Sequence, residues 1–230
     1  MERKRRYWEK RAANRAVQVL RQERDTVLRA IRNSTRATME EAAMKAVDRT
    51  PWPAFYNWLY SNVMEEFSRM TITGFKESKQ IDQEIVEAFE AFMEDATALR
   101  EREVKETSKK RLRELILAAL AAGLTLSYIQ EQIEELYYRD IPIRSKAIGE
   151  TETITAGNAG SFFTAEFLGA VTKVWVAVLD DRTRPSHREI HGESRYLDQL
   201  YSNGLRFPGD PLGASVETIN CRCVETYNIL

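Results

Sequence analysis

The first fifth of the chain carries apolar residues at helical spacing within a highly charged sequence. Residues 7–48 contain no Pro or Gly, and Leu20, Val27 and Ile31 recur at intervals of seven and four, which predicts a long charged helix. The polar pair Asn33-Ser34 is a candidate break in it. The segment 51–53, Pro-Trp-Pro, ends this helical region, because proline cannot continue a helix and restricts the residue before it.

The segment after these prolines predicts an amphipathic helix rich in aromatic residues. Four apolar residues follow one another at intervals of four, namely Phe55, Leu59, Val63 and Phe67. This spacing favours core packing against neighbouring helices. Gly74 marks a break, and Ile81, Ile85, Phe89 and Phe92 then predict a further helix. The charged run 101–113 is either an exposed continuation of that helix or a connector.

Residues 112–138 predict two helices joined by a tight turn. Gly123 supplies a left-handed cap for the first helix, and Thr125 or Ser127 supplies the N-cap of the second. A helix-turn-helix DNA reader would have the same outline. The second helix, however, carries Glu131, Glu134 and Glu135 and has no Arg or Lys before Arg139, so DNA phosphates would be repelled. We therefore predict a packing hairpin.

The pattern changes after Pro142. Residues 151–167 predict a helix of small and aromatic residues, whereas 173–179 is apolar on both faces and β-branched, which is typical of a central, covered strand. We expect Ser186 to cap a short helix and residues 224–230 to form a closing strand. The predicted fold class is α+β, mostly α, with long N-terminal helices before a small C-terminal α+β module. We divide the chain into an extended helical arm and helical region (1–105), a helical hairpin (106–145) and the C-terminal α+β module (146–230).

The charge distribution separates the N-terminal segment from the rest. The whole chain has a formal net charge of −1, but residues 1–36 hold twelve Lys or Arg and four Asp or Glu, so this segment carries +8 and the remainder −9. A basic arm on an acidic body is typical of partner binding. The arm could face an acidic protein, nucleic acid or only water. The candidate partner-binding residues are Arg3, Lys4, Arg5, Arg6, Arg11 and Arg15.

The N-terminus and the apolar runs bear on localisation. The charged start of the chain is unlike a secretory signal. The most apolar run, residues 115–124, is shorter than the ~20 residues that a membrane-spanning helix needs. We therefore expect neither export nor contact with a membrane, and a reducing compartment in which the cysteines are free or bind metal.

Candidate metal chemistry is concentrated near the C-terminus. The chain has two histidines, His187 and His191, and two cysteines, Cys221 and Cys223. Imidazole nitrogen and thiolate sulfur are the ligands that zinc prefers, so these four predict a possible structural zinc site. The alternative is that the cysteines are small buried apolar residues and the histidines make ordinary hydrogen bonds. A disulfide between residues two apart would be strained.

The spacing of the histidines superficially resembles that of a zinc protease helix. Such a protease needs a Glu directly after its first His to activate water. Here Glu189 stands two residues after His187, about 200° around a helix, and points away from a metal. Four protein ligands would also leave no open position for substrate. A zinc hydrolase is therefore the least favoured alternative, and we predict no enzyme activity.

Several C-terminal motifs together resemble those of the phage Mu F-like minor head proteins, also called phage head morphogenesis proteins. In chain order these motifs are Glu150-Thr151-Glu152-Thr153 with Asn158, Lys173-Val174-Trp175, Asp180 to His187, Leu205 to Asp210, and Asn220-Cys221-Arg222-Cys223. The resemblance covers about residues 145–226. The residues that we take to define the module are Glu152, Trp175, Asp180, Arg184 and Asn220.

The resemblance implies a structural protein of a tailed-phage head. It would lie at the portal vertex or inner capsid of the virion, and in the host cytoplasm during assembly, and act in head assembly or DNA delivery. The implied partners are the portal protein, capsid and scaffold proteins and possibly DNA. At His191 the family commonly has an acidic residue, so Asp180 or Asp181 is an alternative fourth ligand beside His187, Cys221 and Cys223.

Overall fold

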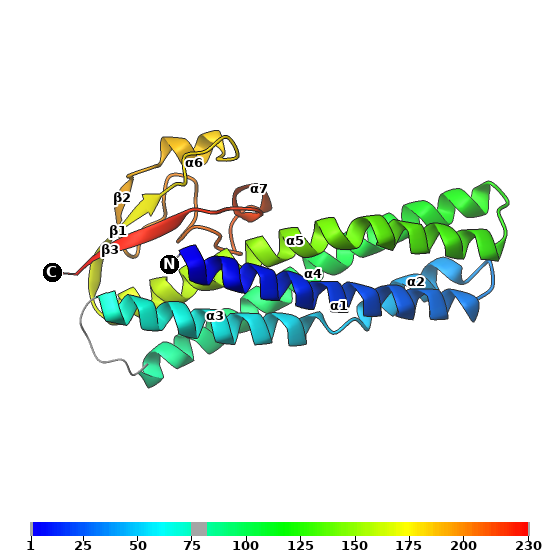
Figure 1. Cartoon of the computed structure of the whole chain (residues 1–230), viewed down its shortest axis with the longest axis horizontal. Helices are drawn as coiled ribbons and strands as arrows, with labels where there is room; N and C mark the ends of the chain where they lie inside the picture. The colour runs from blue at the N-terminus through cyan, green and yellow to red at the C-terminus, as the bar shows by residue number, and fades with distance from the viewer. Residues whose placement is uncertain (1, 75–81, 230) are drawn as a thin grey trace.

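The computed structural model describes residues 2–74 and 82–229, so the predicted apolar position Ile81 lies outside the described residues. Five helices form an elongated bundle, and a small α+β module lies at the end of the bundle where α1 begins (Figure 1). The bundle helices are α1 Glu2–Arg32, α2 Met39–Asp48, α3 Trp52–Gly74, α4 Gln83–Ala121 and α5 Leu126–Phe167. The fold is thus mostly helical with a small sheet at its C-terminus, as the sequence predicts.

Helix α1 is part of the bundle and not a free arm. Trp8, Ala12, Leu20 and Ile31 form its apolar stripe, and each is at most 6% exposed. This stripe packs along α5, with α2 and α3 on its flanks. The expectation of an extended arm is therefore wrong, because a stripe of small and apolar residues lets α1 bury one face. The predicted break is confirmed, since α1 ends at Arg32.

The hairpin between α4 and α5 forms as predicted. Gly123 adopts the left-handed conformation with φ of 71°, which glycine accepts without steric cost. The Thr125 hydroxyl then caps α5 by accepting a hydrogen bond from the Tyr128 amide at 3.3 Å. Residues 101–113 continue α4, and Lys105, Ser108 and Leu112 within this run are buried.

Helices α4 and α5 continue across both of the predicted regional boundaries. The boundary at 105/106 falls inside α4, and the boundary at 145/146 falls inside α5, which also passes through Pro142. No loop therefore separates the predicted regions at either boundary. The division into three regions remains a prediction about units of folding.

The module is built on a three-stranded antiparallel sheet in the order β2-β1-β3. Its elements are β1 Ala170–Val176, α6 Pro185–Glu189, β2 Ser194–Tyr196, α7 Ser215–Thr218 and β3 Val224–Ile229. The predicted central strand and closing strand are both present. Ser186 lies inside α6, whose N-cap is Arg184 without a side-chain cap hydrogen bond. The expected capping role of Ser186 is therefore wrong.

A buried carboxylate links the bundle helices. Glu23 of α1 has no exposed surface, and its Oε1 accepts hydrogen bonds from Ser108 of α4 at 2.6 Å and Tyr137 of α5 at 2.9 Å. Its Oε2 lies 3.3 Å from the Thr50 hydroxyl and 3.4 Å from the indole nitrogen of Trp52, both of which donate. Because buried polar groups are costly without partners, this network fixes how four segments align.

The backbone of α5 approaches α1 and α3 very closely at two glycines. A Cβ atom on Gly149 would lie 2.7 Å from the Glu9 carbonyl oxygen of α1, and one on Gly160 would lie 2.5 Å from the Met64 carbonyl oxygen of α3. Real Cβ atoms essentially never come this close to backbone. Both helix pairs therefore require the absence of a side chain at these positions.

No helix of the described residues is long and apolar enough to cross a membrane.

We predict that Gly160→Ala destabilises the protein by about 1–3 kcal/mol, because an added methyl group in a tight core forces the backbone apart. This cost exceeds the gain of up to ~1 kcal/mol from the higher helix propensity of Ala. Gly74→Ala is the matched control, since a Cβ there meets nothing within 4 Å. Urea unfolding followed by circular dichroism measures both variants. Equal stability of the two would contradict the close packing of α5 on α3.

Candidate functional site: the histidine–cysteine cluster

The structure brings together three of the four predicted metal ligands. His187 is on α6, whereas Cys221 and Cys223 lie in the segment that leads into β3. The His187 Nδ1 atom is 3.8 Å from the Cys221 Sγ and 3.4 Å from the Cys223 Sγ. All three residues are at most 3% exposed, and their ligand atoms lie within 4.8 Å of one another.

These distances fit a tetrahedral metal ion. Zinc binds imidazole nitrogen at about 2.0–2.1 Å and thiolate sulfur at about 2.3 Å, so tetrahedral angles separate the two ligand atoms by about 3.6 Å. The observed separations from Nδ1 to the two sulfurs, 3.8 and 3.4 Å, lie on either side of this value. The three residues could therefore occupy three of the four positions around such an ion.

The other nitrogen of His187 faces a carboxylate. Its Nε2 atom lies 2.9 Å from Oε2 of Glu217 on α7, although the N–H direction is not aligned for a hydrogen bond. The Ser186 hydroxyl donates to the same Glu217 oxygen at 3.0 Å. A histidine that binds metal through one nitrogen usually presents the other to a carboxylate, so Glu217 is placed to orient the ring.

The two cysteines differ in their tendency to ionise. The neighbouring Cys221 side chain, together with the His187 imidazole, holds the pKa of Cys223 below its usual range, against the opposing effect of burial. The nearby Cys223 sulfur, together with burial, raises the pKa of Cys221 well above its usual range. The thiolate and not the thiol is the form that binds a metal ion, and Cys223 is the cysteine of the pair that ionises more readily.

Backbone carbonyls near the cluster are held by an asparagine of α5. The Asn158 side-chain amide donates to the Cys223 carbonyl at 3.0 Å and to the Pro208 carbonyl at 2.7 Å. Asn220 lies in the left-handed region with φ of 58°, and its backbone amide donates to the Thr151 hydroxyl at 2.8 Å. The cysteine segment is thereby attached to α5.

Three of the residues that define the module, Asp180, Arg184 and Trp175, make contacts beside the cluster. Asp180 accepts two hydrogen bonds from the Arg222 guanidinium, which hold the pKa of Asp180 well below its usual range. Arg184 donates to the Ile219 carbonyl. Trp175 is fully buried, and its ring meets the His187 ring edge to face with centroids 5.0 Å apart. These contacts close the loops around the cysteines.

Glu152 is also one of the residues that define the module, but it lies at the interface between the bundle helices. It is 4% exposed, accepts a hydrogen bond from the Tyr60 hydroxyl at 2.6 Å, and lies 3.5 Å from Nε of the buried Arg100. Burial raises the pKa of Glu152, although Arg100 opposes this effect. Glu152 therefore joins α5 to α3 and α4 and does not contribute to the metal cluster.

The structure does not bring His191 to the cluster. His191 lies beyond the end of α6, is exposed, and its Nδ1 accepts a hydrogen bond from the Ala177 amide at 3.1 Å. The alternative ligands Asp180 and Asp181 are also outside the group of three. The sequence reasoning missed Glu217, because its position opposite His187 depends on the fold of a loop-rich segment.

The candidate partner-binding residues of α1 do not form one surface. Arg3 is exposed, and Lys4 pairs with Glu66 of α3. Arg5 and Arg6 both pair with Glu2 at 2.8 Å. Arg11 and Arg15 lie instead over the Trp58 ring, at 5.9 and 4.5 Å from its centroid.

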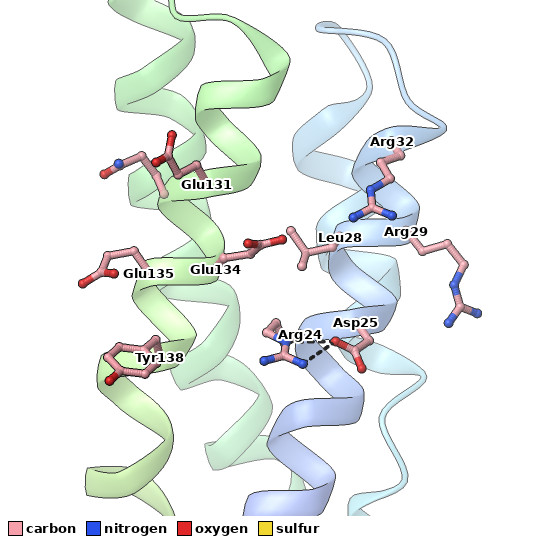
Figure 2. A pocket seen from close by; sticks show the side chains of 10 residues that line it. Arg24, Asp25, Leu28, Arg29, Arg32, Glu131, Glu134, Glu135 and Tyr138 are labelled. Carbon is pink, nitrogen blue, oxygen red and sulfur yellow. Dashed lines mark hydrogen bonds and ion pairs between the residues drawn. The ribbon is translucent and has the colours of Figure 1, made fainter.

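A separate groove of about 930 Å³ runs between α1 and α5 (Figure 2). One wall carries Arg24, Arg29 and Arg32 of α1, and the other carries acidic residues of α5, namely Glu131, Glu134 and Glu135. Arg24 pairs with Asp25 of its own helix at 2.8 Å. Glu131, Glu134 and Glu135, whose charge disfavours a DNA-reading helix, therefore line a groove of mixed charge.

Residues 110–226, half of the chain, match the family described as "Phage Mu protein F like protein". The chain belongs to this family. The matched region begins in α4, includes α5, β1, β2 and the three clustered residues, and ends inside β3, so the family resemblance expected from the C-terminal motifs is confirmed.

Two curated proteins are similar to parts of this family member. Minor head protein GP7 of Bacillus phage SPP1 is 26% identical over 136 residues, which is 55% of this chain and 44% of that protein. NAD(+)–arginine ADP-ribosyltransferase EFV of Enterococcus faecalis is 29% identical over 99 residues, which is 42% of this chain and 20% of that protein. The chain thus spans less than half of either relative. No solved structure matches it.

We predict that Asn220→Ala destabilises the protein by about 1 kcal/mol, because a left-handed backbone is costly for residues other than Gly and Asn. Asn220→Gly should match or exceed the stability of the wild type. The Asn220 side chain is exposed, so the pair tests backbone conformation at the entry to Cys221. Thermal unfolding of both variants measures the difference, and an alanine variant as stable as the glycine variant would refute this account.

Proposed function

We propose that this chain is a minor structural protein of a tailed-phage head, which acts in head morphogenesis at the portal vertex or inner capsid. The family match over half of the chain carries this proposal, and the similarity to a phage minor head protein supports it. The partners would be the portal protein and neighbouring capsid or scaffold proteins. Head assembly and DNA delivery are the two steps in which such a protein would act.

The surface of the bundle supports contact with a protein partner. Tyr138 of α5 is 75% exposed and lines the groove of mixed charge between α1 and α5 (Figure 2). Exposed aromatic side chains beside charged residues are typical of protein interfaces. We propose this side of α5 as the surface that contacts the portal or capsid.

A structural role is favoured over an enzymatic one. The similarity to an ADP-ribosyltransferase covers one fifth of that protein, which is too small a share to support that activity for this chain. A zinc hydrolase would need a water-activating carboxylate beside an accessible metal. Glu189 is exposed on α6, whereas the cluster around His187 is buried.

The cluster itself is proposed to hold a structural zinc ion. The ligands would be Nδ1 of His187 and the sulfurs of Cys221 and Cys223, with Glu217 orienting the imidazole through its other nitrogen. The ion would fasten α6 to the segment before β3 and so stabilise a small module with a limited apolar core. The separations of 3.4 and 3.8 Å support this assignment.

Elemental analysis tests the zinc proposal on protein purified without chelators. We expect about one zinc per chain in the wild type, loss of zinc in His187→Ala, and unchanged content in the control His191→Ala, because His191 lies outside the cluster. His187→Cys, which keeps a soft ligand, should retain metal. Cobalt substitution should add a sulfur-to-cobalt absorption band that disappears in Cys223→Ser.

Zinc far below one equivalent in the folded wild type would overturn this assignment. Equal zinc content in the His187→Ala and His191→Ala variants would also overturn it, because the bound metal would then lie elsewhere. Circular dichroism establishes that each variant is folded before its metal content is compared.

Association with phage heads tests the proposed role. Particles of the phage that encodes this chain are purified on a density gradient and probed for a tagged copy, which should co-sediment with heads. Tyr138→Asp should reduce incorporation several-fold, whereas the control Tyr196→Asp, at a 59% exposed position of the module, should not. A wild-type chain absent from heads would refute the role, and equal incorporation of both variants would refute the α5 surface.

A further inference from the structure

Two adjoining hollows lie where the start of α1 meets α5 and the module. The first, of about 610 Å³, has walls from α1, α5 and the loops around Asp180 and Arg222. The second, of about 390 Å³, lies between α5 and the same loops. Arg182 and Arg222 line both hollows, so the two adjoin at these side chains, and together they are called the cleft below.

Basic residues dominate this cleft although they come from four separate parts of the sequence. They are Arg5, Arg6, Lys146, Arg182, Arg184 and Arg222. The acidic residues that line it are Glu2, Glu150 and Asp180, which leaves a charge of +3. The chain beyond residue 36 carries −9, so the cleft is a basic site on an acidic body.

Several donors in the cleft lack a partner. Among the described residues, Arg182 has no carboxylate within 4.0 Å, because Asp180 is occupied by Arg222. Arg5 makes no hydrogen bond through its buried Nε atom, and its Nη1 atom lies 3.6 Å from the Glu9 carboxylate. Thr153 is fully buried in the wall of the first hollow, and its hydroxyl also has no hydrogen-bond partner. The buried atoms of Arg5 and Thr153 have almost no surface that a ligand could touch, so the donors open to an anion are those of the exposed Arg6, Lys146 and Arg182.

We propose that this basic cleft binds the phosphodiester backbone of DNA. Guanidinium, ammonium and hydroxyl groups are the side chains that contact phosphate oxygens, and a cleft extending over two hollows suits a linear polyanion better than one small anion. The choice of DNA rests on the proposed function, because packaged DNA is the polyanion that a head protein meets. Such contacts position the nucleic acid without reading its sequence.

This site differs from the basic N-terminal arm considered from the sequence. Of the six arm residues, Arg5 and Arg6 line the cleft, while Arg11 and Arg15 lie over Trp58. The other contributions come from α5 and the module, more than a hundred residues later. The fold, and not the local density of arginine in α1, creates the site.

Fluorescence anisotropy with a labelled 30-base-pair duplex tests the proposal on the full chain. The cleft variant is Arg6→Gln/Lys146→Gln/Arg182→Gln, and the matched control is Arg21→Gln/Arg29→Gln/Arg32→Gln on α1; all six positions are exposed. We expect the cleft variant to bind at least about tenfold more weakly and to lose 2–3 units of salt slope. The control should stay within about twofold of the wild type.

Equal losses in the two variants would overturn the proposal, because binding would then follow net charge alone. A wild type that does not bind duplex DNA at low salt would overturn it as well. Incorporation into heads is measured separately: a cleft variant that keeps DNA affinity but no longer enters heads would identify the cleft as a protein contact and refute the DNA site. Normal incorporation of a cleft variant with weakened DNA binding leaves the proposed head role intact and supports the cleft as the DNA-binding site.

Discussion

The close packing of α5 against α1 and α3 is the constraint on which the rest of the structure depends. Gly149 and Gly160 let the backbone of α5 touch the backbones of its neighbours, and the Glu23 network aligns the same helices through hydrogen bonds. The C-terminal half of α5 then carries Thr151 and Asn158, which hold the cysteine segment. One helix therefore organises both the bundle and the module.

The sequence predicts most elements because their signals are local. Apolar periodicity located the bundle helices, Gly123 and Thr125 defined the hairpin, and a covered run of residues indicated β1. The failed prediction of a free arm depends on contacts between distant segments. Docking of α1 along α5 needs Gly149, which lies 140 residues after Glu9, and no local pattern in α1 distinguishes a docked helix from a free arm.

The candidate site likewise combines residues that the sequence predicts with residues that only the tertiary fold brings together. His187, Cys221 and Cys223 were found from residue type alone, because soft ligands are scarce in this chain. His191 and His187 are equivalent candidates for a metal ligand only if both lie on one helix. Helix α6 ends at Glu189, however, and His191 is exposed. Glu217 and the cleft around Arg182 gave no local signal, since each is assembled from loops whose course follows from the tertiary fold.

The contact between Glu9 and Gly149 also has a consequence for synthesis on the ribosome. Chains grow at about 5–20 residues per second, so α1 waits roughly seven to thirty seconds before the part of α5 that covers it has been made. During this interval a basic helix with an apolar stripe from Trp8 to Ile31 has α2 and α3 beside it but lacks α5, its main partner. The nascent protein is therefore most open to chaperones, and to premature association, before α5 has emerged.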